Sequence, residues 1–260
     1  MKTVGTIEEL RAELRGEVGL VPTMGALHDG HLSLFHAARA ENDLIVASLF
    51  VNVAQFGDRS DLAAYPRDEA ADALLAEEAG VDVLFAPAAG EIYPPGFGTW
   101  VDVEDGGAEG AARAGHFRGV ATVCVKLFNI VRPRRAYFGQ KDAQQAIVIR
   151  RVVRDLNLEV QIRVLPTVRD TDGLAFSSRN ARLSSDERGR ALALPRALAA
   201  GAEAHLDGGD AVAATRAALN GLPPDYVEVL DLDGVTILAS AARVGATRII
   251  DNVILEGELT

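Results

Sequence analysis

The sequence predicts an α/β protein: a doubly wound parallel sheet followed by a smaller α+β unit. Through the first two-thirds of the chain, short apolar runs alternate with helical segments of roughly ten to fifteen residues, a pattern typical of βαβ units. After Pro166 the pattern changes to a polar turn, alanine- and leucine-rich helices and late strands. We therefore expect one domain over residues 1–167 and a second over residues 168–260.

The elements of the first domain follow in order along the chain. Thr6 and Glu9 form a capping-box pattern, which predicts a helix to about residue 15. The apolar, β-branched run over residues 44–51 is typical of a strand buried on both faces. The other expected elements are strands over residues 18–21, 81–85, 136–138 and 159–164, helices over residues 31–40, 69–79, 120–131 and 142–156, and loops over residues 87–98 and 105–115.

The second domain is expected to begin with a helix over residues 184–200, for which Ser185 is a plausible N-cap. A helix over residues 210–219 follows. Two strands, over residues 226–230 and 248–255, complete this α+β unit.

Composition narrows the functional classes. The 26 basic and 37 acidic side chains give a net charge of −11, which argues against a general nucleic-acid-binding protein. No run is long and apolar enough to cross a bilayer, and the N-terminal residues lack the apolar core of an export signal. The lone cysteine, Cys124, lies in an apolar helical run and fits a reducing compartment. We expect a cytoplasmic protein that acts on small molecules.

The most informative motif is His28-Asp29-Gly30-His31, between a predicted strand and a helix. Two imidazoles at a helix start can donate hydrogen bonds to phosphate oxygens, and Gly30 would let a nucleotide lie close to the backbone. Two alternatives remain at this point. Both histidines could be exposed surface residues, or they could be zinc ligands, although the chain offers few side chains to complete a zinc site.

Three further polar segments follow predicted strands or the domain change. Asn52 and Gln55 are amide side chains in an otherwise apolar stretch. They are suited to hydrogen-bond a hydroxyl or a carboxylate of a ligand, although they could simply cap the strand end. In the second segment, Gly139 permits close approach of a ligand and Lys141 can contact a phosphate. Asp142 could cap a helix, hold a ribose hydroxyl or organise a metal. Gln145 lies one helical turn further along. The third segment, Ser177-Ser178-Arg179, forms either a phosphate clamp or a plain helix-start loop.

Together these segments carry a family resemblance. They are PTMGALHDGH over residues 22–31, FVNVAQF over 50–56, YPR over 65–67, HFRGV over 116–120, FGQKDAQQ over 138–145 and DGLAFSSRN over 172–180, with a further match over 247–252. In this order and spacing they resemble the pantothenate synthetase (pantoate–β-alanine ligase) family, which belongs to the nucleotidyltransferase superfamily marked by the HxGH signature. The resemblance implies a Rossmann-like first domain and a C-terminal lid domain.

The resemblance also implies a reaction. ATP and (R)-pantoate would give pantoyl adenylate and pyrophosphate, and the amine of β-alanine would then displace AMP to form pantothenate. A magnesium requirement and a homodimer built on the Rossmann-like domain are implied as well. The metal ligands are not identified by the sequence.

Residue roles follow from the matched motifs. His31, His28 and Lys141 are the implied catalytic residues, which with Arg179 could supply positive charge to the phosphates. Gln55, Gln145 and Asn52 are placed at pantoate, and Gln55 also at β-alanine. The implied ATP-binding residues are Met24, Gly25, Ala26, Leu27, His28, Asp29, Gly30, His31, Gly139, Gln140, Lys141, Asp142, Val168, Phe176, Ser177, Ser178 and Arg179.

Three positions depart from the commonest family pattern. Val53 stands where proline is usual, Gln140 where glutamate is frequent, and Phe176 where methionine or leucine is usual, which would bring a larger ring near the adenine site. Two other functions stay open: a different adenylyl- or cytidylyltransferase of the superfamily, or a catalytically inactive nucleotide-binding protein.

Overall fold

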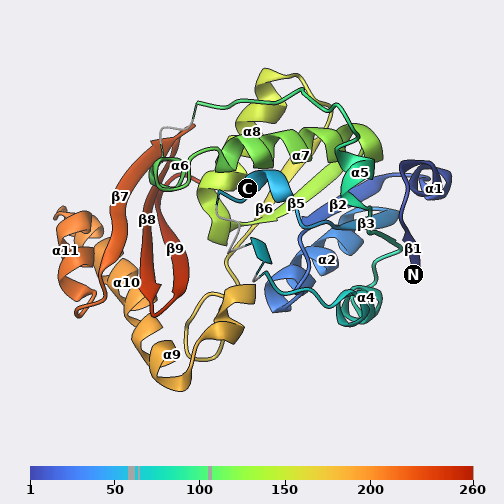
Figure 1. Ribbon diagram of the computed structural model, residues 1–260. Helices are drawn as coiled ribbons and strands as arrows, with labels where there is room; N and C mark the ends of the chain where they lie inside the picture. The colour runs from blue at the N-terminus through green and yellow to red at the C-terminus, as the bar shows by residue number, and fades with distance from the viewer. Residues whose placement is uncertain (58–61, 64, 105–106, 260) are drawn as a thin grey trace.

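The computed structural model describes residues 1–57, 62–63, 65–104 and 107–259. It contains a six-stranded, wholly parallel sheet and a three-stranded antiparallel sheet beside it (Figure 1). The parallel strands lie in the order β1-β4-β3-β2-β5-β6. The order reverses between β2 and β5, which is the switch point of a Rossmann-like sheet. The predicted fold class is confirmed.

The elements of the parallel sheet and its helices run through the first 165 residues. The strands are β1 (Lys2–Val4), β2 (Val18–Thr23), β3 (Leu44–Leu49), β4 (Val83–Phe85), β5 (Arg135–Gly139) and β6 (Gln161–Leu165). The helices are α1 (Ile7–Glu13), α2 (Asp29–Glu41), α4 (Glu69–Glu78), α5 (Ala89–Ile92), α6 (Ala108–Ala112), α7 (His116–Val131) and α8 (Ala143–Asp155), with 3-10 turns η1 (Val53–Gln55) and η2 (Gln140–Asp142).

The C-terminal part holds the antiparallel sheet and three helices. Its elements are η3 (Ser178–Arg182), α9 (Ser185–Ala191), α10 (Ala193–Leu206), α11 (Ala211–Ala218), β7 (Pro224–Leu232), β8 (Val235–Val244) and β9 (Thr247–Glu256). The two sheets share one hydrophobic cluster, in which Tyr226 and Ile237 pack with residues of α7 and α8. The division of the chain at residue 168 stays a prediction.

Alternation along the parallel strands explains the layers. Leu20 of β2 and Val46 of β3 face the cluster that contains α7 and α8, whereas Val21 and Ile45 face the cluster formed with α2 and α4. Helices therefore cover both faces of the sheet (Figure 1). None of the helices within the described ranges has the length and apolar character that a membrane span requires.

Most predicted elements of the parallel sheet are confirmed, including the Thr6–Glu9 capping box of α1. Several boundaries were wrong. The segments expected as loops contain α5 and α6, and α7 begins at His116 rather than at residue 120. The helix expected over residues 184–200 is two helices that meet at Leu192, because Pro195 is tolerated only in the first turn of a new helix, and Ser184 rather than Ser185 is the N-cap. Strands β1 and β8 were not predicted.

Candidate functional site

The candidate site lies where three neighbouring parallel strands end. Strands β3, β2 and β5 are adjacent, and the turns that follow them carry Gln55, the histidine pair and Lys141. A cleft of about 230 Å³ opens there. Of the predicted residues, it is lined by Met24, His28, Gly30, His31, Asn52, Gln55, Gly139, Lys141, Asp142, Gln145, Val168, Phe176, Ser177, Ser178 and Arg179, whereas Gly25, Ala26, Leu27, Asp29 and Gln140 are not among its lining residues.

The histidine pair is held by bonds within its own turn. Nδ1 of His28 accepts from the backbone N–H of Gly30 (3.2 Å), and Nδ1 of His31 accepts from that of His28 (3.3 Å). Since a neutral imidazole that accepts at Nδ1 carries its proton on Nε2, each ring has an Nε2–H donor, and both residues line the cleft. The ring centroids are 4.2 Å apart. The pair is therefore prearranged as two adjacent donors.

Both imidazoles are neutral at neutral pH. Burial lowers the pKa of His28 to about 4 and that of His31 to about 3, and the charge of Lys141 contributes to both shifts. That the histidines bring positive charge to bound phosphates stays a prediction. They offer hydrogen-bond donors, and the cleft's positive charge comes from groups such as Lys141.

Gly30 has a local structural role beside the predicted one, and its close approach to a nucleotide stays a prediction. A Cβ at this position would lie 2.9 Å from Cε1 and 3.0 Å from Nδ1 of His28. The glycine thus leaves room for the His28 ring, which folds back over it. The Phe176 ring stacks on the His28 ring, with centroids 5.9 Å apart, so it packs against the turn that carries the histidine pair.

Asp72 of α4 supports the turn from outside. Its buried carboxylate accepts from the backbone N–H groups of Ala26 (2.9 Å) and Leu27 (2.7 Å). Ala26 has a positive φ of 51°, which is costly for a residue with a side chain. The two bonds to Asp72 stabilise that backbone and so fix the approach to His28. Sequence reasoning missed Asp72, because an aspartate inside a helix carries no signal of a remote backbone contact.

Asn52 and Gln55 form one buried unit. The Asn52 amide donates to Oε1 of Gln55 (2.9 Å) and to the carbonyl of Gly119 (3.1 Å), and its oxygen accepts from the Tyr93 hydroxyl (2.8 Å). It also accepts from the N–H of Ala54, so the amide is fully bonded within the protein. A Cβ at Gly119 would lie 2.4 Å from the Ala54 carbonyl oxygen, so only glycine allows this approach of α7. These bonds favour Asn52 as the residue that orients Gln55, whose Nε2 is left for the cleft.

Lys141 and Asp142 form an ion pair on the opposite wall. Nζ of Lys141 lies 3.0 Å from Oδ2 of Asp142. Burial opposes ionisation of Asp142, but Lys141 holds the pKa of its carboxyl below the usual value. Asp142 makes no capping bond to α8, so the capping alternative is wrong. An added Cβ at Gly139 would meet no atom within 4 Å, which leaves open space beside the lysine.

The segment over residues 168–180 has a defined local structure. Ser177 caps the 3-10 turn η3 by accepting from the N–H of Arg179 (3.2 Å), which confirms the helix-start alternative for this motif. The backbone N–H of Phe176 donates a hydrogen bond to the backbone carbonyl of Val168 (3.1 Å). Because both serines and Arg179 also line the cleft, a ligand-binding role stays a prediction beside the confirmed local one.

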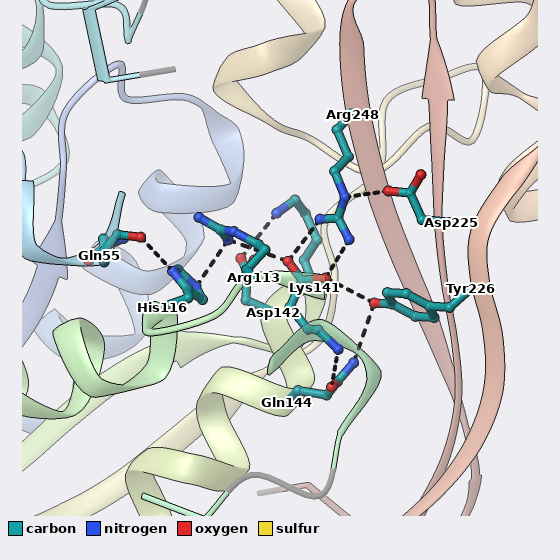
Figure 2. A network of polar contacts seen from close by, with 10 residues as sticks. Gln55, Arg113, His116, Lys141, Asp142, Gln144, Asp225, Tyr226 and Arg248 are labelled. Atoms are coloured by element: carbon teal, nitrogen blue, oxygen red, sulfur yellow. Dashed lines mark hydrogen bonds and ion pairs between the residues drawn. The ribbon is translucent and has the colours of Figure 1, made fainter. Parts of the chain in front are cut away.

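A polar network connects the cleft to the C-terminal sheet (Figure 2). Arg113 donates to Nε2 of His116 (3.0 Å), so the proton on Nδ1 of His116 is donated to the backbone carbonyl of Gln55 (3.0 Å). Burial and the charge of Arg113 lower the pKa of His116 to about 4. Arg113 also forms an ion pair with Glu109 (3.3 Å). Arg248 of β9 donates two hydrogen bonds of 2.8 Å to the same carboxylate.

Glu109 is the centre of this network. Its carboxylate also accepts from the Tyr226 hydroxyl (3.1 Å), and its backbone N–H donates to Gln144 (3.0 Å). Burial raises its pKa, but Arg248 and Arg113 hold the pKa below its usual value. Sequence reasoning assigned no role to Glu109, Arg113 or His116. The HFRGV match was a signal for His116 alone, since Glu109 and Arg113 lie before it in a segment expected to be a loop. Within the described residues, no three acidic, histidine or cysteine side chains cluster as a metal site would require.

The chain matches one family along almost its whole length. The family model described as pantoate-beta-alanine ligase matches residues 1–254. The pantothenate synthetase of Roseiflexus castenholzii is 54% identical over 98% of both chains, and that of Moorella thermoacetica is 51% identical over 98% of this chain and 99% of its own. The crystal structure of pantothenate synthetase from Thermus thermophilus has a TM-score of 0.95 at 47% identity, covering 99% of this chain and 100% of that one. The pantoate-beta-alanine ligase of Francisella tularensis, complexed with beta-gamma ATP and beta-alanine, has a TM-score of 0.86 at 33% identity over both full chains.

Proposed function

Because the chain belongs to the pantoate–β-alanine ligase family, and is a ligase that forms pantothenate, we propose that it works through an adenylate. Pantoate attacks the α-phosphorus of ATP, and pyrophosphate leaves. The amine of β-alanine then attacks the acyl carbon of pantoyl adenylate, and AMP leaves. The observation that carries this proposal is the meeting of phosphate-type donors and two glutamines in one cleft.

The donors support the first step. His28, His31 and Lys141 come from the ends of β2 and β5, where an incoming triphosphate would meet two N–H groups and one cation. Adenylation needs mainly positioning and stabilisation of charge that grows on phosphate oxygens. Beside them, Gln55 and Gln145 offer neutral amides to a small hydroxy acid. That combination supports pantoate as the acceptor of the adenylyl group.

The Francisella tularensis relative, complexed with beta-gamma ATP and beta-alanine, supports ATP and β-alanine as substrates here. Magnesium is proposed as the partner of ATP. Such sites typically use one or two carboxylates together with the phosphates, and Asp142 on the cleft wall fits that donor set. When bound, the ion would partly neutralise the negative charge of the phosphates.

An isotope experiment tests the intermediate directly. Pantoate labelled with ¹⁸O in its carboxylate is incubated with ATP, magnesium and β-alanine, and the products are analysed by mass spectrometry. An adenylate route transfers one labelled oxygen to AMP. Label in inorganic phosphate, with ADP as product, would contradict the adenylate and indicate an acyl phosphate.

Substrate omission tests the alternatives. Pyrophosphate should form with ATP and pantoate, and net AMP should require β-alanine as well. Turnover without pantoate would favour another nucleotidyltransferase, and nucleotide binding without any turnover would favour an inactive binding protein. Homodimerisation and a cytoplasmic location stay predictions, and light scattering in solution tests the first.

A further inference from the structure

Strand β9 approaches the cleft from the C-terminal sheet, although none of the reacting groups lies on it. Its neighbouring residues Arg248, Asp251 and Asn252 each bond to a different segment that faces the cleft. Arg248 reaches the backbone of Gln55 through Glu109, Arg113 and His116, as described above (Figure 2).

Asp251 holds the start of the segment over residues 168–180, which carries Ser177, Ser178 and Arg179. Its carboxylate, almost wholly buried, accepts two bonds from Arg169, of 2.7 and 3.0 Å. Arg169 directly follows Val168 and also donates to the carbonyl of Gly173 (3.2 Å). The geometry is bidentate, which specifies orientation as well as distance.

Asn252 makes the most direct connection. Its buried amide nitrogen donates 2.9 Å bonds to the carbonyl oxygens of both Gln140 and Lys141, and its oxygen accepts from the Gln140 side chain (3.4 Å). Both N–H groups of one amide are thereby used on two consecutive carbonyls of η2. The backbone that carries the Lys141 ammonium is held by a residue of another sheet.

We propose that Asn252 is a positioning residue for the adenylation step, acting through the backbone of Lys141. The inference rests on the function proposed above, in which Lys141 stabilises charge on the phosphates. The two N–H donors are the essential chemistry. An aspartate of the same shape has none and would place an anion against two carbonyl oxygens, so the turn would shift and take the ammonium with it.

The experiment measures pyrophosphate formation from ATP and pantoate. Asn252→Asp should lower the maximal rate on the order of 10- to 100-fold, as expected for a displaced catalytic group. The matched control is Asn129→Asp on the exposed face of α7, which also removes a donor to a backbone carbonyl, and it should keep the wild-type rate.

A double variant separates positioning from general damage. If Asn252 acts through Lys141, then Lys141→Ala combined with Asn252→Asp should be no slower than Lys141→Ala alone. Two losses that multiply would overturn the proposal. Should Asn252→Asp fold poorly by circular dichroism, Asn252→Ser retains one donor without a charge. It should show a smaller loss that again disappears in the Lys141→Ala background, and a wild-type rate for it would overturn the proposal.

A wild-type protein that forms no pyrophosphate from ATP and pantoate would overturn the proposed function and this inference with it. An active wild type beside an equally active Asn252→Asp would overturn this inference alone.

Discussion

The turn that carries His28 and His31 (the histidine turn) and the turn that carries Lys141 (the lysine turn) line the same cleft but are held in different ways. The rings of the histidine turn are held locally, since His28 and His31 each bond to backbone within three residues, whereas the backbone before them is supported by Asp72 of α4. The lysine turn depends on Asn252, which lies 111 positions beyond Lys141 in the chain. Local bonds form together with the helix that they cap, whereas a remote bond requires that both sheets be folded and in place. The site thus combines a part fixed by local sequence with a part fixed by tertiary structure.

The largest expected effect tests whether both turns serve one step. His31→Ala and Lys141→Ala should each slow pyrophosphate formation on the order of 10²- to 10³-fold, the usual result of removing a prearranged donor to a charge that develops in the transition state. Rapid-quench assays measure the rate, and circular dichroism checks the fold. Near-normal adenylate formation by either folded variant would remove that turn from the chemistry.

The next effect concerns the remote support of the histidine turn. Asp72→Ala leaves two backbone N–H groups without their acceptor, and we expect a loss of about 2–4 kcal/mol in the free energy of unfolding, with slower pyrophosphate formation. Urea unfolding and the same assay measure both. Asp68→Ala, which removes only the N-cap of α4, should cost about 1 kcal/mol and leave the rate unchanged. Equal effects of the two variants would show that Asp72 stabilises its helix rather than the turn.

A smaller effect tests the local geometry of the histidine rings. Gly30→Ala should displace the His28 ring, because the new Cβ would lie 2.9 Å from it, and we expect a rate loss of about tenfold with little change in stability. Gly90→Ala is the control, since its Cβ would meet nothing within 4 Å. An unchanged rate for Gly30→Ala would mean that the ring position is not critical.

A separate effect, on stability rather than on rate, is a pH dependence. His28, His31 and His116 have folded-state pKa values of about 4, 3 and 4, below the ordinary value of about 6.5. The unfolded chain therefore binds more protons between these values, so stability is full above pH 6.5 and decreases as the pH falls toward 4. Urea unfolding at pH 7, 6 and 5 should show the decrease, and His28→Asn should make it shallower. A slope that is the same in the variant would contradict the neutral state assigned to His28.

The contrast between the two turns also explains what the sequence could and could not predict. The strand-end positions of His28, Gln55 and Lys141 were predictable, because apolar runs locate buried strands and parallel strands end at one edge. Asp72, Glu109 and Asn252 were not, since their partners lie far away in the chain. Strand β8 was missed because it is rich in alanine and buried on both faces, so it lacks the alternation that marks an exposed strand.

The position of Asn252 in the chain also bears on how the protein is made. At a typical synthesis rate of about 5–20 residues per second, Asn252, 111 positions after Lys141, is synthesised roughly 5–20 s later. During that time the parallel sheet can form while η2 still lacks its anchor. Catalytic competence should therefore arise late in the life of the nascent chain, well after the first strands have paired.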